Sequence, residues 1–290
     1  MKLTDLFRDS KFVITSEVAP PKGTRTAEMI ENAERLKPRV DAINITDQQS
    51  SVMRLGSLAA SRMLKVRGIE PVFQLTCRDR NRIALQSDLL SAWALGIENV
   101  LCLTGDHVTL GDFPDAKAVF DLDSVSLLAA AKRLNGGSDM GGNELEGSPD
   151  FCLGAVVTPG ADPVELQLIK MEKKIAAGAA FFQTQAVFDG EAFARFVEEA
   201  KGFGVPVMAG IILLKSPGMA RFMNENVAGV HVPDALIDEM ANAEDRPAKS
   251  VEIAARLISE IRDVCQGVHI MPLGWEKRVP EVLEAAGLGV

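Results

Sequence analysis

The chain has 290 residues, of which 47% are hydrophobic and 24% are charged, a composition typical of a globular protein. The net charge of −9 argues against a nucleic-acid-binding protein, and no apolar run approaches the roughly 20 residues of a membrane span. The N-terminus lacks a signal-peptide pattern, and the four cysteines are scattered without a Cys-x-x-Cys pair, so we expect a cytoplasmic protein without its own metal centre.

Short β-rich runs alternate with helical periodicity along the whole chain. We predict helices over 26–37, 80–96, 124–134, 163–179 and 190–204, and two helical patterns over 216–226 and 233–264 in the last long connection. The predicted strands are Phe12–Val18, Ala42–Thr46, Pro71–Thr76, Asn99–Thr104, Phe151–Thr158, Phe181–Val187, Pro206–Leu214 and Gly267–Leu273.

Eight strands that alternate with helices predict an α/β fold, a (β/α)8 TIM barrel that takes up residues 1–290 as one domain. A doubly wound open sheet is the alternative. That fold usually has fewer strands, and its first turn often carries a glycine-rich fingerprint. No G-x-G-x-x-G sequence follows the first predicted strand, which favours the barrel.

Polar residues gather at the C-terminal ends of the predicted strands, where active sites of this barrel lie. Glu17 stands where the first strand runs out, before Pro20 and Pro21; it is either a solvated strand end or an acid that moves protons. Gln183 and Gln185 point to one face of their strand, because side chains alternate along a strand. Buried amides need hydrogen-bond partners, and a polar ligand in the barrel mouth would supply them.

Six segments together carry a family resemblance: "SEVAPPKG", "QLTCRDRN", "LCLTGDH", "VFDLDSVSLL", "EKKIAAGAAFFQTQAVFD" and "GVHIMPLGWE". In this order they resemble the methylenetetrahydrofolate reductase family over nearly the whole chain. The resemblance implies a barrel that binds a flavin, FAD or FMN, and reduces 5,10-methylenetetrahydrofolate to 5-methyltetrahydrofolate. It also implies a ping-pong reaction, in which NADH, NADPH or a partner subunit first reduces the flavin.

The resemblance assigns roles to individual residues. Glu17 matches the acid that protonates the folate nitrogen, Asp106 the acid beside flavin and pterin, and Gln185 the glutamine that binds folate. Further substrate contacts are implied for Phe222, Glu276 and Arg278. The implied flavin-binding positions are Thr46, Gln74, Thr104, Gly105, Asp106, Phe120, Asp121 and Thr158, with Lys170, Lys173 and Lys174 at the phosphate end.

Some positions depart from the family pattern. Gln74 stands where a histidine is common, the segment after the seventh strand lacks an expected glutamine, and "LGWEKR" replaces an asparagine–arginine pair. The motifs resemble the branch found in anaerobic one-carbon metabolism, which implies an oligomer or a complex with a subunit that carries zinc or iron–sulfur centres. Two alternatives stay open: a flavin-dependent barrel dehydrogenase related to proline dehydrogenase, and a non-catalytic subunit of a redox complex.

Overall fold

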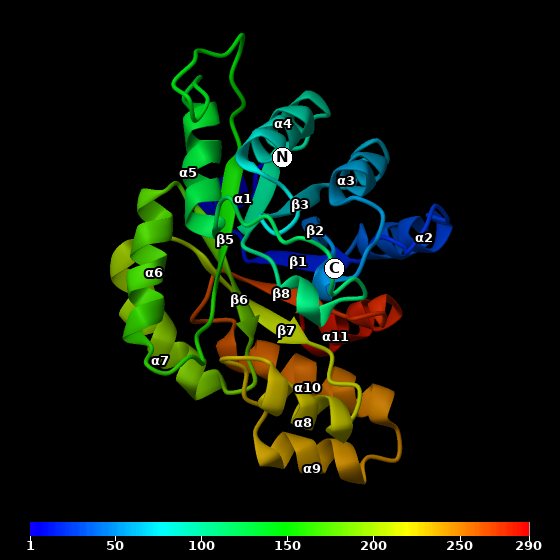
Figure 1. Ribbon diagram of the computed structural model, residues 1–290. Helices are drawn as coiled ribbons and strands as arrows, with labels where there is room; N and C mark the ends of the chain where they lie inside the picture. Colours follow the sequence, from blue (N-terminus) through cyan, green and yellow to red (C-terminus); the bar gives the residue numbers. More distant parts are fainter. Residues whose placement is uncertain (290) are drawn as a thin grey trace.

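The computed structural model describes residues 1–289 and contains a closed barrel of eight parallel strands, numbered in order around the barrel (Figure 1). Each strand lies inside its predicted range, and the predicted (β/α)8 barrel is confirmed. The strands are β1 (Val13–Val18), β2 (Ala42–Ile45), β3 (Pro71–Thr76), β4 (Asn99–Leu103), β5 (Cys152–Val157), β6 (Phe181–Ala186), β7 (Val207–Ile212) and β8 (Gly267–Met271).

Helices surround the barrel, and across residues 1–289 none combines the length and apolar character that crossing a membrane requires. The helix α3 was not predicted, because its buried face carries the polar residues Ser57 and Ser61, which hide the apolar periodicity. The helices are α1 (Leu3–Arg8), α2 (Ala27–Leu36), α3 (Ser57–Lys65), α4 (Arg82–Ala94), α5 (Ser124–Asn135), α6 (Glu165–Ala176), α7 (Gly190–Ala200), α8 (Pro217–Asn226), α9 (Asp234–Asn242), α10 (Arg246–Ile261) and α11 (Val279–Ala285).

The helical pattern predicted over 233–264 forms two helices, α9 and α10. Asp245 causes the break, because its side chain caps α10 by accepting a hydrogen bond from the Ala248 N–H at 3.0 Å. Pro247 lies in the first turn of α10, where a missing N–H costs nothing. In Figure 1 these helices and α8 form a group beyond β7, at the lower side of the view.

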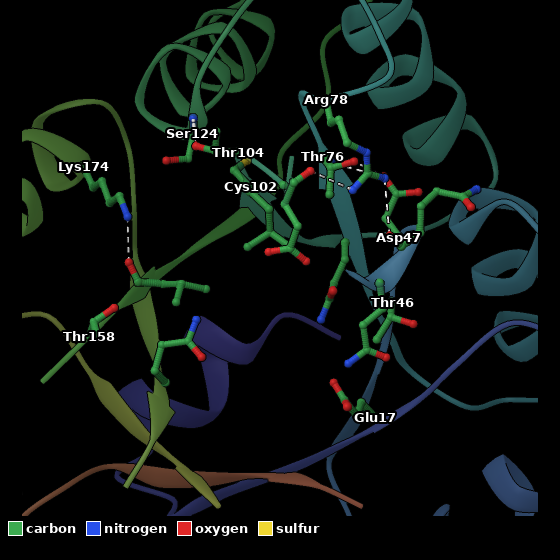
Figure 2. Close-up of a pocket in the computed structure, with 18 of the residues that line it drawn as sticks. Glu17, Thr46, Asp47, Thr76, Arg78, Cys102, Thr104, Ser124, Thr158 and Lys174 are labelled. Carbon is green, nitrogen blue, oxygen red and sulfur yellow. Dashed lines mark hydrogen bonds between the residues drawn. The ribbon is translucent and has the colours of Figure 1, made fainter. Parts of the chain in front are cut away.

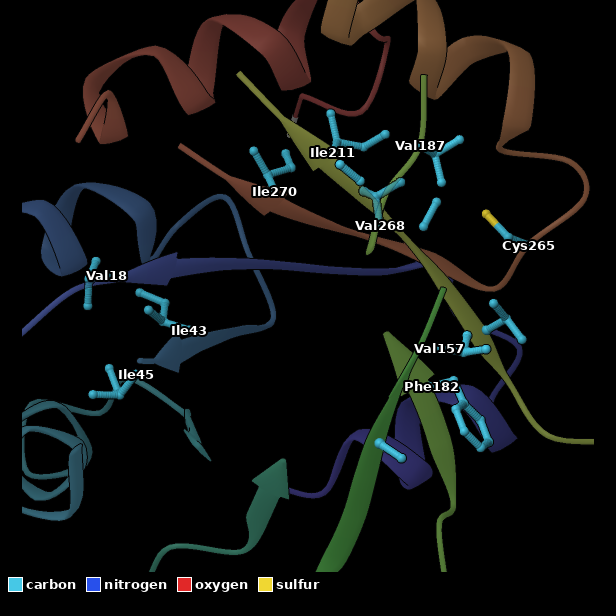
Figure 3. Packing of buried hydrophobic residues seen from close by; sticks show 14 of the residues in the cluster. Val18, Ile43, Ile45, Val157, Phe182, Val187, Ile211, Cys265, Val268 and Ile270 are labelled. Carbon is cyan, nitrogen blue, oxygen red and sulfur yellow. The ribbon is translucent and has the colours of Figure 1, made fainter. Parts of the chain in front are cut away.

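The main hydrophobic core lies between the strands and the helices. Outward-facing residues such as Ile43 and Ile45 of β2, and Val268 and Ile270 of β8, are fully buried in it (Figure 3). Burial of this much aliphatic surface is the main stabilising contribution to the fold. Because side chains alternate along each strand, the residues between these point into the barrel.

The barrel interior changes from apolar to polar in steps of two residues. At the N-terminal end, α1 closes the barrel with Leu3, which belongs to one buried cluster with Val13 and Phe181. The Leu3 N–H donates to Asn99 Oδ1 at 2.8 Å. Two residues further along the strands lie Thr15, Asn44, Gln183 and His269, all buried. Two residues further still lie Glu17, Thr46 and Gln185, where the barrel opens.

The barrel closes between β1 and β8 at a position that needs glycine. Gly267 is paired with Val13, and a Cβ at this residue would lie 2.1 Å from the Val13 carbonyl oxygen. A real side chain cannot approach backbone so closely, so any larger residue would separate the two strands.

We expect Gly267→Ala to lower the free energy of unfolding by about 3 kcal/mol or more, because the added methyl group must displace backbone. Gly202→Ala is the matched control: a Cβ on Gly202 would have no other atom within 4 Å, and we expect a change below about 1 kcal/mol. Urea denaturation followed by circular dichroism measures both. Equal stabilities of the two variants would show that the β1–β8 contact tolerates a side chain.

Candidate active site

A cavity of about 420 Å³ lies where the C-terminal ends of the strands meet. Figure 2 shows Glu17 and Thr46 on one side of it and Lys174 and Thr158 on the other. The structure thus brings together side chains from strands that are far apart in the sequence. The predicted site residues that line this cavity are Glu17, Thr46, Gln74, Thr104, Gly105, Asp106, Thr158, Lys170, Lys174 and Gln185.

Several of these polar groups have no protein partner. The Thr46 hydroxyl is buried and makes no hydrogen bond with any described residue. The side chains of Gln74, of the half-buried Gln185 and of the exposed Asp106 likewise make none within residues 1–289. Since buried polar groups are costly when unpaired, the Thr46 hydroxyl and the Gln74 amide in particular fit a ligand with a polar edge.

Gln183 differs from its neighbour Gln185, and our expectation that a ligand would satisfy both was wrong for Gln183. Its amide exchanges hydrogen bonds with the Asn44 amide, at 2.8 and 3.3 Å, and donates to Thr15 Oγ1 at 3.2 Å. Gln183 is 2% exposed and does not line the cavity. It therefore belongs to the polar layer inside the barrel, below the site.

Glu17 is 6% exposed and borders two cavities. Its Oε2 lies 3.7 Å from His269 Nε2, in the polar layer below. The second cavity, of about 490 Å³, lies between the loops after β1, β2 and β8, and Arg25, Arg54 and Glu276 contribute to its lining. The predicted substrate residue Glu276 is thus near Glu17 but outside the main cavity, with its carboxylate accepting from Asn32 Nδ2 at 3.3 Å.

A cationic end of the main cavity is formed by Lys170 and Lys174 of α6. The Lys174 ammonium donates to the Val156 carbonyl at 2.7 Å and has no carboxylate partner among the described residues. Burial lowers the pKa of Lys174, and repulsion from Lys170 lowers it further. A bound anion would offset both effects, so this end suits a phosphate or carboxylate group.

Two buried ionic groups hold the rim of the cavity. Asp47 is fully buried as a side chain and accepts hydrogen bonds from Arg80 Nη1 at 2.8 Å and from the N–H and hydroxyl of Thr76, both at 2.9 Å. Arg78 is 1% exposed and donates to the Asp106 and Gln48 carbonyls, both at 3.3 Å. These contacts tie together the loops that follow β2, β3 and β4.

Besides Glu276, five predicted site residues do not line the main cavity. Asp121 forms a two-fold ion pair with Arg82, which lowers the pKa of its carboxyl to about 2. The Phe120 ring stacks on His107, with 6.2 Å between ring centroids, and the Phe222 side chain is exposed. The five residues are Phe120, Asp121, Lys173, Phe222 and Arg278.

The sequence interpretation missed Arg78 and His269. Arg78 lies in "QLTCRDRN" but carried no role, and nothing local in the sequence marks an arginine as buried. His269 could have been found, because Val268 and Ile270 face the core and alternation turns His269 into the barrel. Within residues 1–289, no three His, Cys, Asp or Glu side chains converge as a metal site requires.

Comparison with known proteins gives a consistent picture. The family model described as methylenetetrahydrofolate reductase matches residues 2–287. A 5,10-methylenetetrahydrofolate reductase of Pectobacterium carotovorum is 29% identical over 69% of this chain and 63% of its own length. A probable methylenetetrahydrofolate reductase (NADPH) of Caenorhabditis elegans is 24% identical over 86% of this chain, which spans only 36% of that relative.

Solved structures support the fold. A Clostridium thermocellum protein that binds two copies of 5-methyl-5,6,7,8-tetrahydrofolic acid superimposes with a TM-score of 0.67 and 18% identity, over 99% of this chain and 97% of that one. A 2,3-dimethylmalate lyase gives a TM-score of 0.54 at 11% identity, over 99% and 88% of the two chains. At these identities the likeness shows the barrel fold and nothing of the chemistry.

We expect Asp47→Asn to lower the free energy of unfolding by about 3 kcal/mol, because it removes the negative partner of a buried ion pair. Glu198→Gln, in the exposed pair with Lys201, is the control and should change it by less than about 1 kcal/mol. Urea denaturation at neutral pH measures both. A loss as small for Asp47→Asn as for the control would contradict a structural role for this pair.

Proposed function

The chain belongs to the methylenetetrahydrofolate reductase family, and we propose that it interconverts 5,10-methylenetetrahydrofolate and 5-methyltetrahydrofolate with the help of a flavin. One observation carries the proposal: Glu17, Asp106 and Gln185, from three different strand ends, border one cavity. The 5-methyltetrahydrofolic acid bound by the Clostridium thermocellum protein of the same fold supports folate as the ligand class.

The residues of the main cavity fit a flavin. The unpartnered Thr46 hydroxyl and the Gln74 amide can pair with the polar edge of an isoalloxazine ring. Gly105 has φ +92°, a conformation that favours glycine, and adds no side chain to this part of the cavity. A Cβ there would lie only 3.1 Å from Thr76 Cβ. Lys170 and Lys174 would hold the phosphate end, and either FAD or FMN satisfies these contacts. When bound, the flavin supplies the hydride chemistry.

Glu17 is the proposed general acid. It gives its proton to the folate nitrogen, so that the methylene bridge opens and becomes able to accept a hydride. In the opposite direction its carboxylate takes that proton back.

Asp106 and Gln185 are proposed to orient the pterin ring. Neither side chain has a protein partner within residues 1–289, so both are available to the substrate. A carboxylate accepts and an amide both donates and accepts, which matches the mixed edge of a pterin. Correct orientation of the methylene group is a large part of the rate enhancement that such a site can give.

The electron donor is proposed to be NADH, NADPH or a partner subunit; the Caenorhabditis elegans relative is named for NADPH. All four cysteines are free and buried in this chain. Burial also raises the pKa of the Cys77 thiol to about 12, which keeps it protonated and unreactive. A zinc or iron–sulfur centre in the electron path would therefore belong to a partner.

We expect Glu17→Gln to bind flavin and allow its reduction by dithionite, yet to slow the bleaching of the flavin by 5-methyltetrahydrofolate at least about 100-fold. Glu31→Gln, an exposed carboxylate of α2 paired with Arg35, is the control and should keep the wild-type rate. Stopped-flow absorbance measures the bleaching. A near-normal bleaching rate for Glu17→Gln would contradict the assignment of Glu17 as the general acid. A wild-type protein that is bleached by proline, or that does not bind flavin, would overturn the proposed function.

The cationic end predicts a difference between adjacent lysines. Lys174→Met should weaken flavin binding about tenfold, because it removes a charge that lies inside the cavity. Lys173→Met should change it less than about twofold, since this exposed residue does not line the cavity. Fluorescence quenching of the flavin measures both affinities. Equal effects of the two changes would contradict the assignment of Lys174 to the phosphate end.

A further inference from the structure

The polar layer below Glu17 forms a continuous chain of hydrogen bonds across the barrel. Asn44 Nδ2 donates to Gln183 Oε1 at 2.8 Å, and Gln183 Nε2 donates to Thr15 Oγ1 at 3.2 Å. Thr15 Oγ1 lies 3.0 Å from His269 Nδ1, and His269 Nε2 lies 3.7 Å from Glu17 Oε2. All members of the chain are less than 10% exposed.

The contact between Thr15 and His269 bears on where the imidazole carries its hydrogen. Thr15 Oγ1 accepts from Gln183 Nε2 and has its own hydrogen available for His269 Nδ1. With Nδ1 as the acceptor, a neutral ring has its N–H at Nε2. This N–H faces the Glu17 carboxylate.

We propose that His269 is a positioning residue that holds the Glu17 carboxylate in place through its Nε2–H, with Thr15, Gln183 and Asn44 orienting the imidazole. The inference rests on the proposed role of Glu17 as the acid. The gap of 3.7 Å is longer than a hydrogen bond, and catalytic hydrogen bonds commonly tighten when substrate binds.

Other charges surround Glu17 but stay unchanged in the experiment below. They are Asp47, Arg78, Asp106, Lys170 and Lys174 around the main cavity and Arg25, Glu28, Arg54 and Glu276 around the second. Their combined field is therefore the same in every variant. A shift in the pH dependence then reports the change at His269 alone.

The test compares His269→Met, which cannot donate, with His269→Gln, whose amide can. In His269→Met the midpoint of the pH profile for flavin bleaching by 5-methyltetrahydrofolate should move up by about one pH unit, because the ionised acid loses a donor. His269→Gln should stay near the wild-type midpoint. Ser16→Ala is the matched control: it removes a buried hydrogen bond, Ser16 Oγ to the Ile270 carbonyl at 2.9 Å, between the same two strands without touching the ring.

A midpoint that stays constant while the rate falls at all pH values would mean a purely structural role and would overturn the proposal. Wild-type protein that is not bleached by 5-methyltetrahydrofolate would instead overturn the proposed function, so the two failures are distinguishable.

A second readout needs neither flavin nor folate. The chain has three histidines, so ¹⁵N-histidine labelling gives three ring patterns, and His269→Gln identifies the one from His269. At pH 8 we expect the Nε2–H tautomer for His269 in the wild type and in Ser16→Ala. An Nδ1–H tautomer would leave a bare nitrogen facing Glu17, which would overturn the inference whatever the pH profiles show.

Discussion

The parallel contact between β1 and β8 is the constraint on which the site depends. It closes the barrel, and it needs a residue without a side chain at Gly267 because the Val13 carbonyl lies so near. The same contact pairs Thr15 with His269 and so sets the level of the polar layer. With the strands closed in this register, Glu17 from β1 and Gln185 from β6 border the same space, although many residues separate them in the chain.

The polar residues near the barrel mouth fall into two groups. Asp47, Arg78 and Gln183 have protein partners and hold strands and loops in place. Thr46, Gln74 and Gln185 line the cavity without such partners among residues 1–289. Polar residues that are hydrogen-bonded within the protein thus surround a small set of unpaired donors and acceptors. Such a site needs little reorganisation when a ligand binds.

The sequence predicted the barrel well because strand signals in a parallel sheet are strong: each strand is a short, β-rich and largely apolar run. It predicted the cavity lining because strand ends converge in this fold and family motifs mark them. The sequence-based prediction failed where contacts between distant parts of the chain determine the structure. The partners of Gln183 lie on other strands, the Asp245 cap divides a continuous helical pattern, and the burial of Arg78 depends on loops that meet only in the folded chain.

Glu17 borders two cavities, so its carboxylate can be approached from either one. A ligand in the main cavity would leave the second cavity, lined in part by Arg54 and Glu276, free. In the proposed reaction, the second cavity gives a proton a way to Glu17 while folate still occupies the main one.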